Sequence, residues 1–254
     1  MFRRFLPAPP GPVFLTALHL ARGWRLSAIL LLGFASGLPL ALTGQAMQAW
    51  LTIDGIDLAT IGFFGLVGIP YTFKFLWAPL MDRFEPPWLG RRRGWLVLPQ
   101  LALAALLWWM STLSPAVAPA AFALAAVLVA FLSASQDVVV DAYRTDLLPE
   151  EERGLGASVH VFAYRLAMIL SGGIALIWAG QWQSWPRVYE TMAAIMLACS
   201  VLSLFLLPGV SAALKPLDSD PRRELLGFVA MLGGIVVGYW LARLLLIALG
   251  LDPN

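Results

Sequence analysis

The sequence predicts an all-α membrane protein, built from a bundle of six transmembrane helices and one further transmembrane helix. Hydrophobic residues make up 60% of the chain and charged residues only 13%, whereas globular domains average about 45–50% and about 25%. Apolar stretches long enough to cross about 30 Å of hydrocarbon recur seven times. The alternating ten-residue segments of membrane barrels are lacking, so we expect each stretch to be a helix.

The predicted spans define four parts of the chain. We place the spans near 26–50, 58–82, 94–113, 116–143, 156–180, 187–208 and 224–250. The expected parts are a cytoplasmic or interfacial tail over 1–25, a six-helix transmembrane bundle over 26–208, a polar cytoplasmic linker over 209–223, and a seventh transmembrane helix with a short outer tail over 224–254.

The basic residues predict the orientation of the bundle. Most of the 17 Lys and Arg residues lie in the tail and in alternate loops, whereas the loops between those carry only Arg187. The positive-inside rule therefore places the N-terminus in the cytoplasm. The interfacial tryptophans, such as Trp50 and Trp182, lie near predicted span ends, where indole rings are favoured.

Four ionisable residues lie within the six-helix bundle: Lys74 in span two, Asp137 and Asp141 in span four, and Arg165 in span five. Asp137 and Asp141 are four residues apart, so they share one face of a helix. At 1.5 Å per residue, Lys74, Asp137 and Arg165 lie roughly 9–14 Å from the cytoplasmic span ends. Because an unpaired desolvated charge costs several kcal/mol, we expect these groups to pair in one layer.

Two interpretations of this charged layer compete. In the first, a buried carboxylate, foremost Asp137, gains and loses a proton as a cavity changes sides, while Lys74 or Arg165 binds an anionic group of a solute. In the second, the four charges form a static network that holds spans two, four and five together, and Asp141, near the interface, suits that role best. We favour proton coupling because the layer contains more charges than one locking pair needs.

Polar residues within the spans are candidates for contacts with a solute. They are Gln45, Gln48, Tyr71, Gln136 and Tyr164. Their amides and hydroxyls can form hydrogen bonds with a polar solute, although hydrogen bonds between helices explain the amides equally well. His160, one turn before Tyr164, is either a titrating group or an ordinary interfacial histidine.

Glycine and proline predict local irregularities in spans one and two. In span one, Gly33, Gly37, Pro39 and Gly44 make the helix easy to bend. In span two, close helix packing and a kink are expected from Gly62, Gly65, Gly68 and Pro70.

A six-helix bundle followed by a cytoplasmic linker resembles one half of a major facilitator transporter, in which two halves close around a midplane site. The loop after span two adds to this resemblance, since an Asp-Arg pair precedes a basic cluster: Asp82, Arg83, Arg91, Arg92 and Arg93. The family's loop signature implies that Asp82 pairs with cytoplasmic helix ends and stabilises the outward-facing state. Here Pro86 and Pro87 lengthen the usual spacing.

At a finer level the chain resembles the muropeptide permeases of the AmpG type, which are related to acetyl-coenzyme A transporters. The resemblance covers roughly 26–208 and is carried by GFASGLPLALTGQAMQAWL, LATIGFFGLVGIPYTFKFLWAPLMDRF, LGRRRGW and SQDVVVDAYRTDLLPEEERGLGAS. It implies a multi-pass protein of the bacterial inner membrane that imports anhydromuropeptides by proton symport, a step of peptidoglycan recycling.

Other classes of function are not supported by any motif. There is no Walker loop, no Cys/His spacing for a metal and no enzyme signature, so no cofactor is expected, and the basic residues are explained by cytoplasmic loops rather than by nucleic acid. The expected partners are the lipid bilayer, a solute, protons, and a second copy of the chain or a missing C-terminal half. The alternatives are a half-length remnant or accessory membrane protein that transports nothing, or a transporter of another anionic solute such as an acyl-coenzyme A.

Overall fold

A computed structural model describes residues 12–83 and 91–208, and all regular structure in these residues is helical. Six stretches are long and apolar enough to cross a membrane: Leu20–Ile53, Leu58–Leu76, Arg93–Ser111, Pro119–Leu147, Glu150–Trp182 and Trp185–Leu206. They overlap the first six predicted spans and confirm the predicted fold class. The predicted linker, 209–223, and the part over 224–254 lie outside the described residues.

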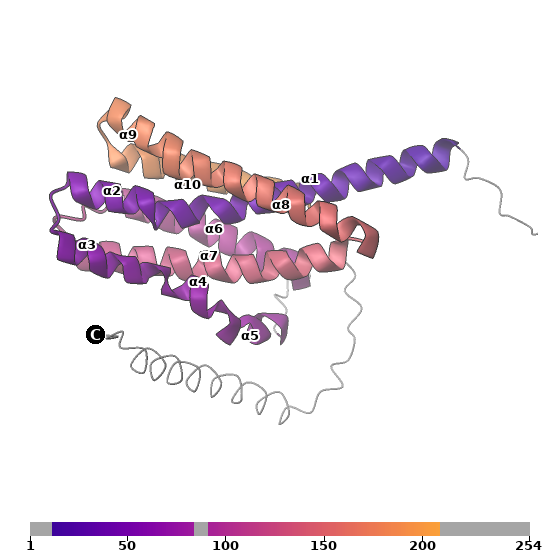
Figure 1. The fold of residues 1–254 in the computed structure, drawn as a ribbon, viewed down its shortest axis with the longest axis horizontal. Helices are drawn as coiled ribbons and strands as arrows, with labels where there is room; N and C mark the ends of the chain where they lie inside the picture. The colour runs from indigo at the N-terminus through magenta and orange to yellow at the C-terminus, as the bar shows by residue number, and fades with distance from the viewer. Residues whose placement is uncertain (1–11, 84–90, 209–254) are drawn as a thin grey trace, which may run out of the picture. The chain divides into compact units, whose positions relative to one another are not determined.

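Several spans are divided into shorter helices (Figure 1). Span one consists of α1 (Pro12–Leu42) and α2 (Gln45–Ile53), and span two of α3 (Leu58–Phe64), η1 (Gly65–Gly68), α4 (Ile69–Phe73) and η2 (Lys74–Leu76), followed by α5 (Ala78–Arg83). Spans three and four are α6 (Arg91–Ser111) and α7 (Pro119–Leu147). Span five comprises η3 (Glu150–Glu152), α8 (Arg153–Met168), the π-helix η4 (Ile169–Ile174) and α9 (Ala175–Trp182), and span six is α10 (Trp185–Leu206).

Helix α1 begins at Pro12 and continues without a break into span one, so it starts before the predicted boundary at residue 26. The residues that follow Pro12 are rich in Leu and Ala, which favour a helix, and proline is well tolerated in a first helical turn. Residues 1–11 of the predicted tail lie outside the described residues.

Span one is interrupted at Thr43 and Gly44, between α1 and α2. Pro39 lies inside the last turns of α1, and the Thr43 hydroxyl donates a hydrogen bond to the Pro39 carbonyl oxygen at 3.1 Å. Gly44 then adopts φ −110° and ψ −108°, which are not helical values. The predicted bend in span one is therefore confirmed, and its place is the end of the Pro39 turn.

Two other glycines bring α1 against α8. A Cβ atom at Gly33 would lie 2.6 Å from the carbonyl oxygen of His160, and one at Gly37 would clash with the backbone of Tyr164. Gly33 and Gly37 are four residues apart, the spacing at which small residues allow two membrane helices to approach closely. This contact fixes the part of α8 that carries His160 and Tyr164.

The core lies among α1, α2, α6, α7 and α10. Near one end, the Trp50 ring packs 5.1 Å from Phe122 and 5.0 Å from Tyr189, measured between ring centroids. The Tyr189 hydroxyl donates a hydrogen bond of 2.7 Å to the Leu42 carbonyl oxygen. These contacts join spans one, four and six through side chains that are almost completely buried.

Span two is the least buried of the six candidate spans. A Cβ atom added to Gly62, Gly65 or Gly68 would meet nothing within 4 Å in the described part of the chain. Close packing at these glycines, which the sequence predicted, is therefore not found there. A local irregularity is confirmed, since the α-helix changes to the 3-10 turn η1 just before Pro70.

Candidate functional site

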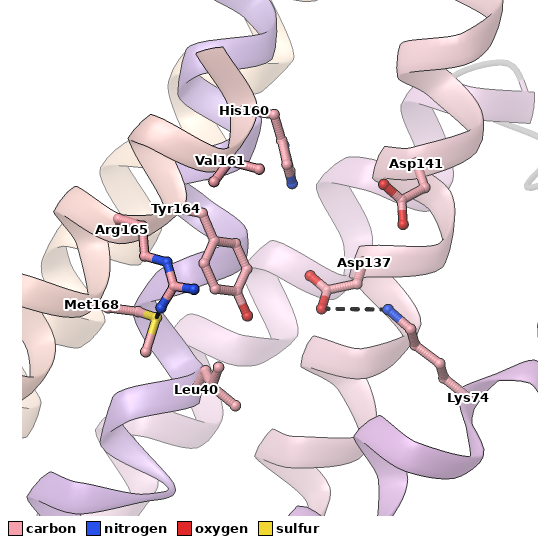
Figure 2. Close-up of a pocket in the computed structure, with 9 residues that line it drawn as sticks. All are labelled: Leu40, Lys74, Asp137, Asp141, His160, Val161, Tyr164, Arg165 and Met168. Carbon is pink, nitrogen blue, oxygen red and sulfur yellow. Dashed lines mark hydrogen bonds and ion pairs between the residues drawn. The ribbon is translucent and has the colours of Figure 1, made fainter. Parts of the chain in front are cut away.

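A polar pocket of about 370 Å³ lies among α1, η2, α7 and α8 (Figure 2). Its charged and polar walls come from Lys74, Asp137, Asp141, His160, Tyr164 and Arg165. Its apolar walls come from Leu40, Val161 and Met168. All four charges that the sequence predicted in one layer therefore line a single pocket.

Asp137 and Lys74 form an ion pair across two spans. The Oδ2 atom of Asp137 lies 3.9 Å from the Nζ atom of Lys74, which is beyond hydrogen-bond distance. The Asp137 side chain is 14% exposed and the Lys74 side chain 35% exposed. The carboxylate is thus mostly withdrawn from solvent, whereas its cation is more exposed. The pair can separate without breaking a hydrogen bond.

Asp141 lies one turn from Asp137 on the same face of α7, as its spacing predicted (Figure 2). Its Oδ1 atom lies 3.2 Å from the Nη2 atom of Arg144, three residues later on the same helix. The Asp141 side chain is 54% exposed. Since its partner comes from the same helix, the Asp141 pair does not tie two spans together.

Arg165 lies on the opposite wall of the pocket, beside Tyr164 on α8 (Figure 2). Its Nη1 atom lies 3.9 Å from the sulfur of Met168, and it forms no ion pair with any residue that the structure describes. The expectation that all charges of the layer pair with one another therefore holds for Lys74 and not for Arg165.

His160 also faces the pocket, between α8 and the aspartates of α7 (Figure 2). Its Nδ1 atom is buried and accepts or donates no hydrogen bond among residues 12–83 and 91–208. Sequence reasoning placed His160 near the site without deciding its role. Sequence reasoning did not predict that Val161 and Met168 line the pocket. Their helical spacing from Arg165 would have placed them on the same face of α8.

The other predicted solute contacts do not line this pocket. Gln136 is fully buried, and its amide donates a hydrogen bond of 3.4 Å to the Ser36 hydroxyl. The Tyr71 hydroxyl is buried and has no hydrogen-bond partner in the described chain. Gln45 and Gln48 are exposed on α2. Of the five polar candidates, only Tyr164 is brought into the pocket with the charges.

The predicted loop signature is divided between two helices. Asp82 and Arg83 end α5, and Arg91, Arg92 and Arg93 begin α6. The Arg93 guanidinium donates a hydrogen bond of 2.8 Å from Nη2 to the Leu204 carbonyl oxygen near the end of α10. This contact satisfies a terminal helix carbonyl, and the role expected of Asp82 stays a prediction.

A third ion pair joins α1 to the start of span five. Arg25 on α1 donates two hydrogen bonds from Nη2 to the Glu152 carboxylate, at 3.1 Å and 3.0 Å. Arg22 adds an ion pair of 3.7 Å to the same carboxylate. Nothing in the sequence indicates that Glu152 binds α1. A pair of residues so far apart in the chain produces no periodic pattern in the sequence from which the contact could be predicted.

The described residues contain no group of three or more His, Cys, Asp or Glu side chains that could hold a metal ion. The single cysteine, Cys199, is buried in the hydrophobic core. The chemistry of the polar pocket is therefore that of carboxylate, ammonium, guanidinium, imidazole and phenol groups.

Comparison with known proteins shows which family the chain belongs to. Residues 29–251 match the sequence model of the Major Facilitator Superfamily. The chain is 51% identical over 197 residues to the anhydromuropeptide permease of Escherichia coli strain K12, 33% identical over 184 residues to the putative transporter AmpG 4 of Rickettsia conorii, and 32% identical over 182 residues to the putative transporter AmpG 1 of Rickettsia felis.

These alignments cover 78%, 71% and 70% of this chain, respectively, and 39%, 44% and 41% of the three relatives. They confirm the predicted resemblance to muropeptide permeases of the AmpG type. The relatives are named as permeases and transporters, in agreement with the prediction that the chain is not an enzyme. The chain spans less than half the length of these curated relatives.

Proposed function

Because the chain belongs to the major facilitator superfamily, we propose that its six-helix bundle is the proton-coupling half of an importer of anhydromuropeptides. The observation that carries the proposal is the polar pocket, in which Asp137 and Lys74 form a loose ion pair opposite Arg165. The 51% identity to an anhydromuropeptide permease supports this choice of solute.

Asp137 is the proposed proton carrier. A carboxylate that is mostly withdrawn from water is costly to keep charged, and a nearby ammonium offsets that cost. When Asp137 is protonated, Lys74 loses its partner and becomes available to an anion. When the anion leaves, Lys74 favours ionised Asp137 again, so binding of solute and binding of the proton support each other.

Arg165 is the proposed anchor for an anionic group of the solute. It faces the pocket and forms no ion pair in the described residues, and guanidinium groups bind carboxylates through two parallel hydrogen bonds. The peptide stem of a muropeptide supplies such a carboxylate. Tyr164, beside Arg165, offers a phenol to the sugar or to the peptide backbone.

Alternating access requires a second bundle that moves against the first. We assign this role to a C-terminal half or to a second copy of the chain, in keeping with the greater length of the relatives. We further propose that the protein resides in the bacterial inner membrane with its N-terminus in the cytoplasm, since the basic residues favour that orientation.

The first experiment is the intact mass of the protein extracted from its native membrane. A mass near 27.6 kDa assigns the second bundle to a separate chain or to a second copy, and a mass near twice this value assigns it to the same chain. The species so identified is then reconstituted into vesicles, and uptake of labelled anhydromuropeptide is followed under an imposed proton gradient.

The decisive variant is Asp137→Asn, which we expect to abolish uphill uptake while the protein still inserts into the membrane. Asp54→Asn, which removes an exposed carboxylate outside the pocket, is the matched control and should accumulate solute normally. Accumulation by Asp137→Asn at the wild-type level would refute proton coupling at this residue. Absence of uptake by the wild-type assembly would favour an accessory protein, and competition by an acyl-coenzyme A would favour that solute.

A further inference from the structure

A second hollow of about 440 Å³ lies between α6 and α10, on helices that contribute nothing to the polar pocket. Its floor consists of four alanines, Ala104 and Ala105 from α6 and Ala193 and Ala194 from α10. Small side chains from both helices meet at the same level, so the two helices leave a trough between them. We call this hollow the alanine trough.

The walls of the alanine trough are apolar and exposed. Leu101 is 41% exposed, Leu197 is 47% exposed and Trp108 is 63% exposed. Both helices are candidate membrane spans, so this surface has to be covered by hydrocarbon or by another protein. An empty apolar trough loses the dispersion contacts that a matching chain would supply.

The trough runs along the span, from one end toward the middle. The Ser200 hydroxyl donates a hydrogen bond of 3.4 Å to the Val97 carbonyl oxygen, and Arg93 bonds to the Leu204 carbonyl oxygen. The two contacts show that α6 and α10 are antiparallel, which brings Trp108 and Glu190 to the same level. Glu190 is five residues into α10, or about 7.5 Å from its first residue. From Glu190 to Leu197 the trough extends for about 10 Å, the length of half an acyl chain.

A single carboxylate, Glu190, stands at the mouth of the trough. Among residues 12–83 and 91–208 it forms no ion pair, and Arg187, one turn earlier, does not line the trough. A carboxylate next to apolar surface near the end of a candidate span favours a cation that donates hydrogen bonds to it. Trp108 at the same level is typical of the interface between hydrocarbon and headgroups.

We propose that the alanine trough binds one acyl chain of a phospholipid whose headgroup carries a primary ammonium, with that ammonium hydrogen-bonded to Glu190. The acyl chain covers the alanines, and the leucines flank it. A phosphatidylethanolamine has the required headgroup. A phosphatidylcholine has a cation without an N–H donor, and a phosphatidylglycerol has no cation. The affinity of the site should therefore decrease from phosphatidylethanolamine to phosphatidylcholine to phosphatidylglycerol. The inference does not depend on the transported solute.

The test uses the whole chain in bilayers that contain equal amounts of the three lipids with identical acyl chains. The protein is extracted, and the lipids that remain bound are counted per chain by native mass spectrometry. We expect about tenfold enrichment of phosphatidylethanolamine over phosphatidylcholine, which corresponds to about 1.4 kcal/mol. Glu190→Gln should remove this enrichment, whereas Asp54→Asn, at a carboxylate outside the trough, should keep it.

A second variant separates the trough from lipid that merely surrounds the protein. Ala194→Trp fills the trough and should reduce all retained lipid, whereas Ala198→Trp, one turn later and exposed outside the trough, should not. Equal retention of the three lipids by the wild-type chain, or enrichment that survives Glu190→Gln, would overturn the proposal. So would retention that Ala194→Trp leaves unchanged, or a protein segment found in the trough in place of lipid.

Discussion

The ammonium of Lys74 lies 3.9 Å from the carboxylate of Asp137, near enough for attraction and too far for a hydrogen bond. Lys74 comes from η2, the short 3-10 turn in span two, and Asp137 comes from α7 in span four. The pair therefore depends on the relative positions of two spans, one of which is the least buried of the bundle. A small shift of span two would separate the two charges.

Removal of Lys74 alone should destabilise the bundle more than removal of both charges. Lys74→Met leaves Asp137 without its cation and should lower the unfolding free energy by roughly 1–3 kcal/mol, because a withdrawn carboxylate then lacks a partner. Lys74→Met combined with Asp137→Asn should recover most of this loss. The measurement is denaturant unfolding, in one detergent, of Lys74→Met, Asp137→Asn and the double variant. Additive losses would show that the two charges are not coupled.

Close approach of α1 and α8 makes Gly37 intolerant of a side chain. Gly37→Ala should destabilise the protein by about 1–3 kcal/mol, since its Cβ would meet the backbone of Tyr164, which cannot swing away as a side chain can. Gly62→Ala is the matched control. That site is open in the described chain, and the added methyl should stabilise the helix by about 0.5–1 kcal/mol. Equal melting temperatures of the two variants would contradict this packing.

The sequence was sufficient for the membrane spans and for the charged layer because both depend on residue type along one helix. Hydrophobic length identifies a span, and helical spacing puts Asp137 and Asp141 on one face. To predict that these charges lie together in a polar site required only the rule that charges buried in a membrane turn toward polar surroundings. The places of Lys74 and Arg165 in this layer were predicted from their distance to the cytoplasmic span ends alone.

Contacts between spans were harder to predict. Gly33 and Gly37 were interpreted as points where the helix bends. In the structure they instead allow α8 to pack closely against α1. Gln136 adjoins Asp137 in sequence, but one residue along a helix is a rotation of about 100°, which turns it toward Ser36 and away from the pocket. Such outcomes depend on how helices pack, and a single sequence contains no direct record of that packing.

The Arg25 and Glu152 pair should hold α1 to the start of span five. Both side chains are partly buried, and the Nη2 atom of Arg25 donates two hydrogen bonds to the Glu152 carboxylate. The contact is therefore more extensive than that of an exposed ion pair without hydrogen bonds. Glu152→Gln should lower the unfolding free energy by about 1 kcal/mol, whereas Glu150→Gln should change it little. Exchange of the two charges, Arg25→Glu with Glu152→Arg, should restore part of the loss. Failure of the exchange to restore any of it would argue against a direct pair.

Asp57 makes the start of span two sensitive to acid. It caps α3 from outside the span, and its carboxylate accepts hydrogen bonds from the Thr60 hydroxyl at 2.7 Å and from the Thr60 backbone N–H at 3.0 Å. These bonds, led by that from the hydroxyl, lower the pKa of Asp57 below its ordinary value of 3.8. Because the folded pKa is the lower one, the cap stabilises α3 fully above about pH 4. The stabilisation is lost as pH falls through the folded pKa.

Thr60→Val removes the hydroxyl and keeps the shape of the side chain, so the pKa of Asp57 should rise toward its ordinary value. The titration of the Asp57 carboxyl carbon, followed by NMR in detergent micelles, measures this change directly. Thr52→Val is the control, since the Thr52 hydroxyl bonds to the Gln48 carbonyl oxygen and not to Asp57. If the Asp57 midpoint is the same in Thr60→Val as in the wild type, the hydroxyl is not what lowers it. A midpoint that moves equally in both variants would indicate a general change at this end of the bundle.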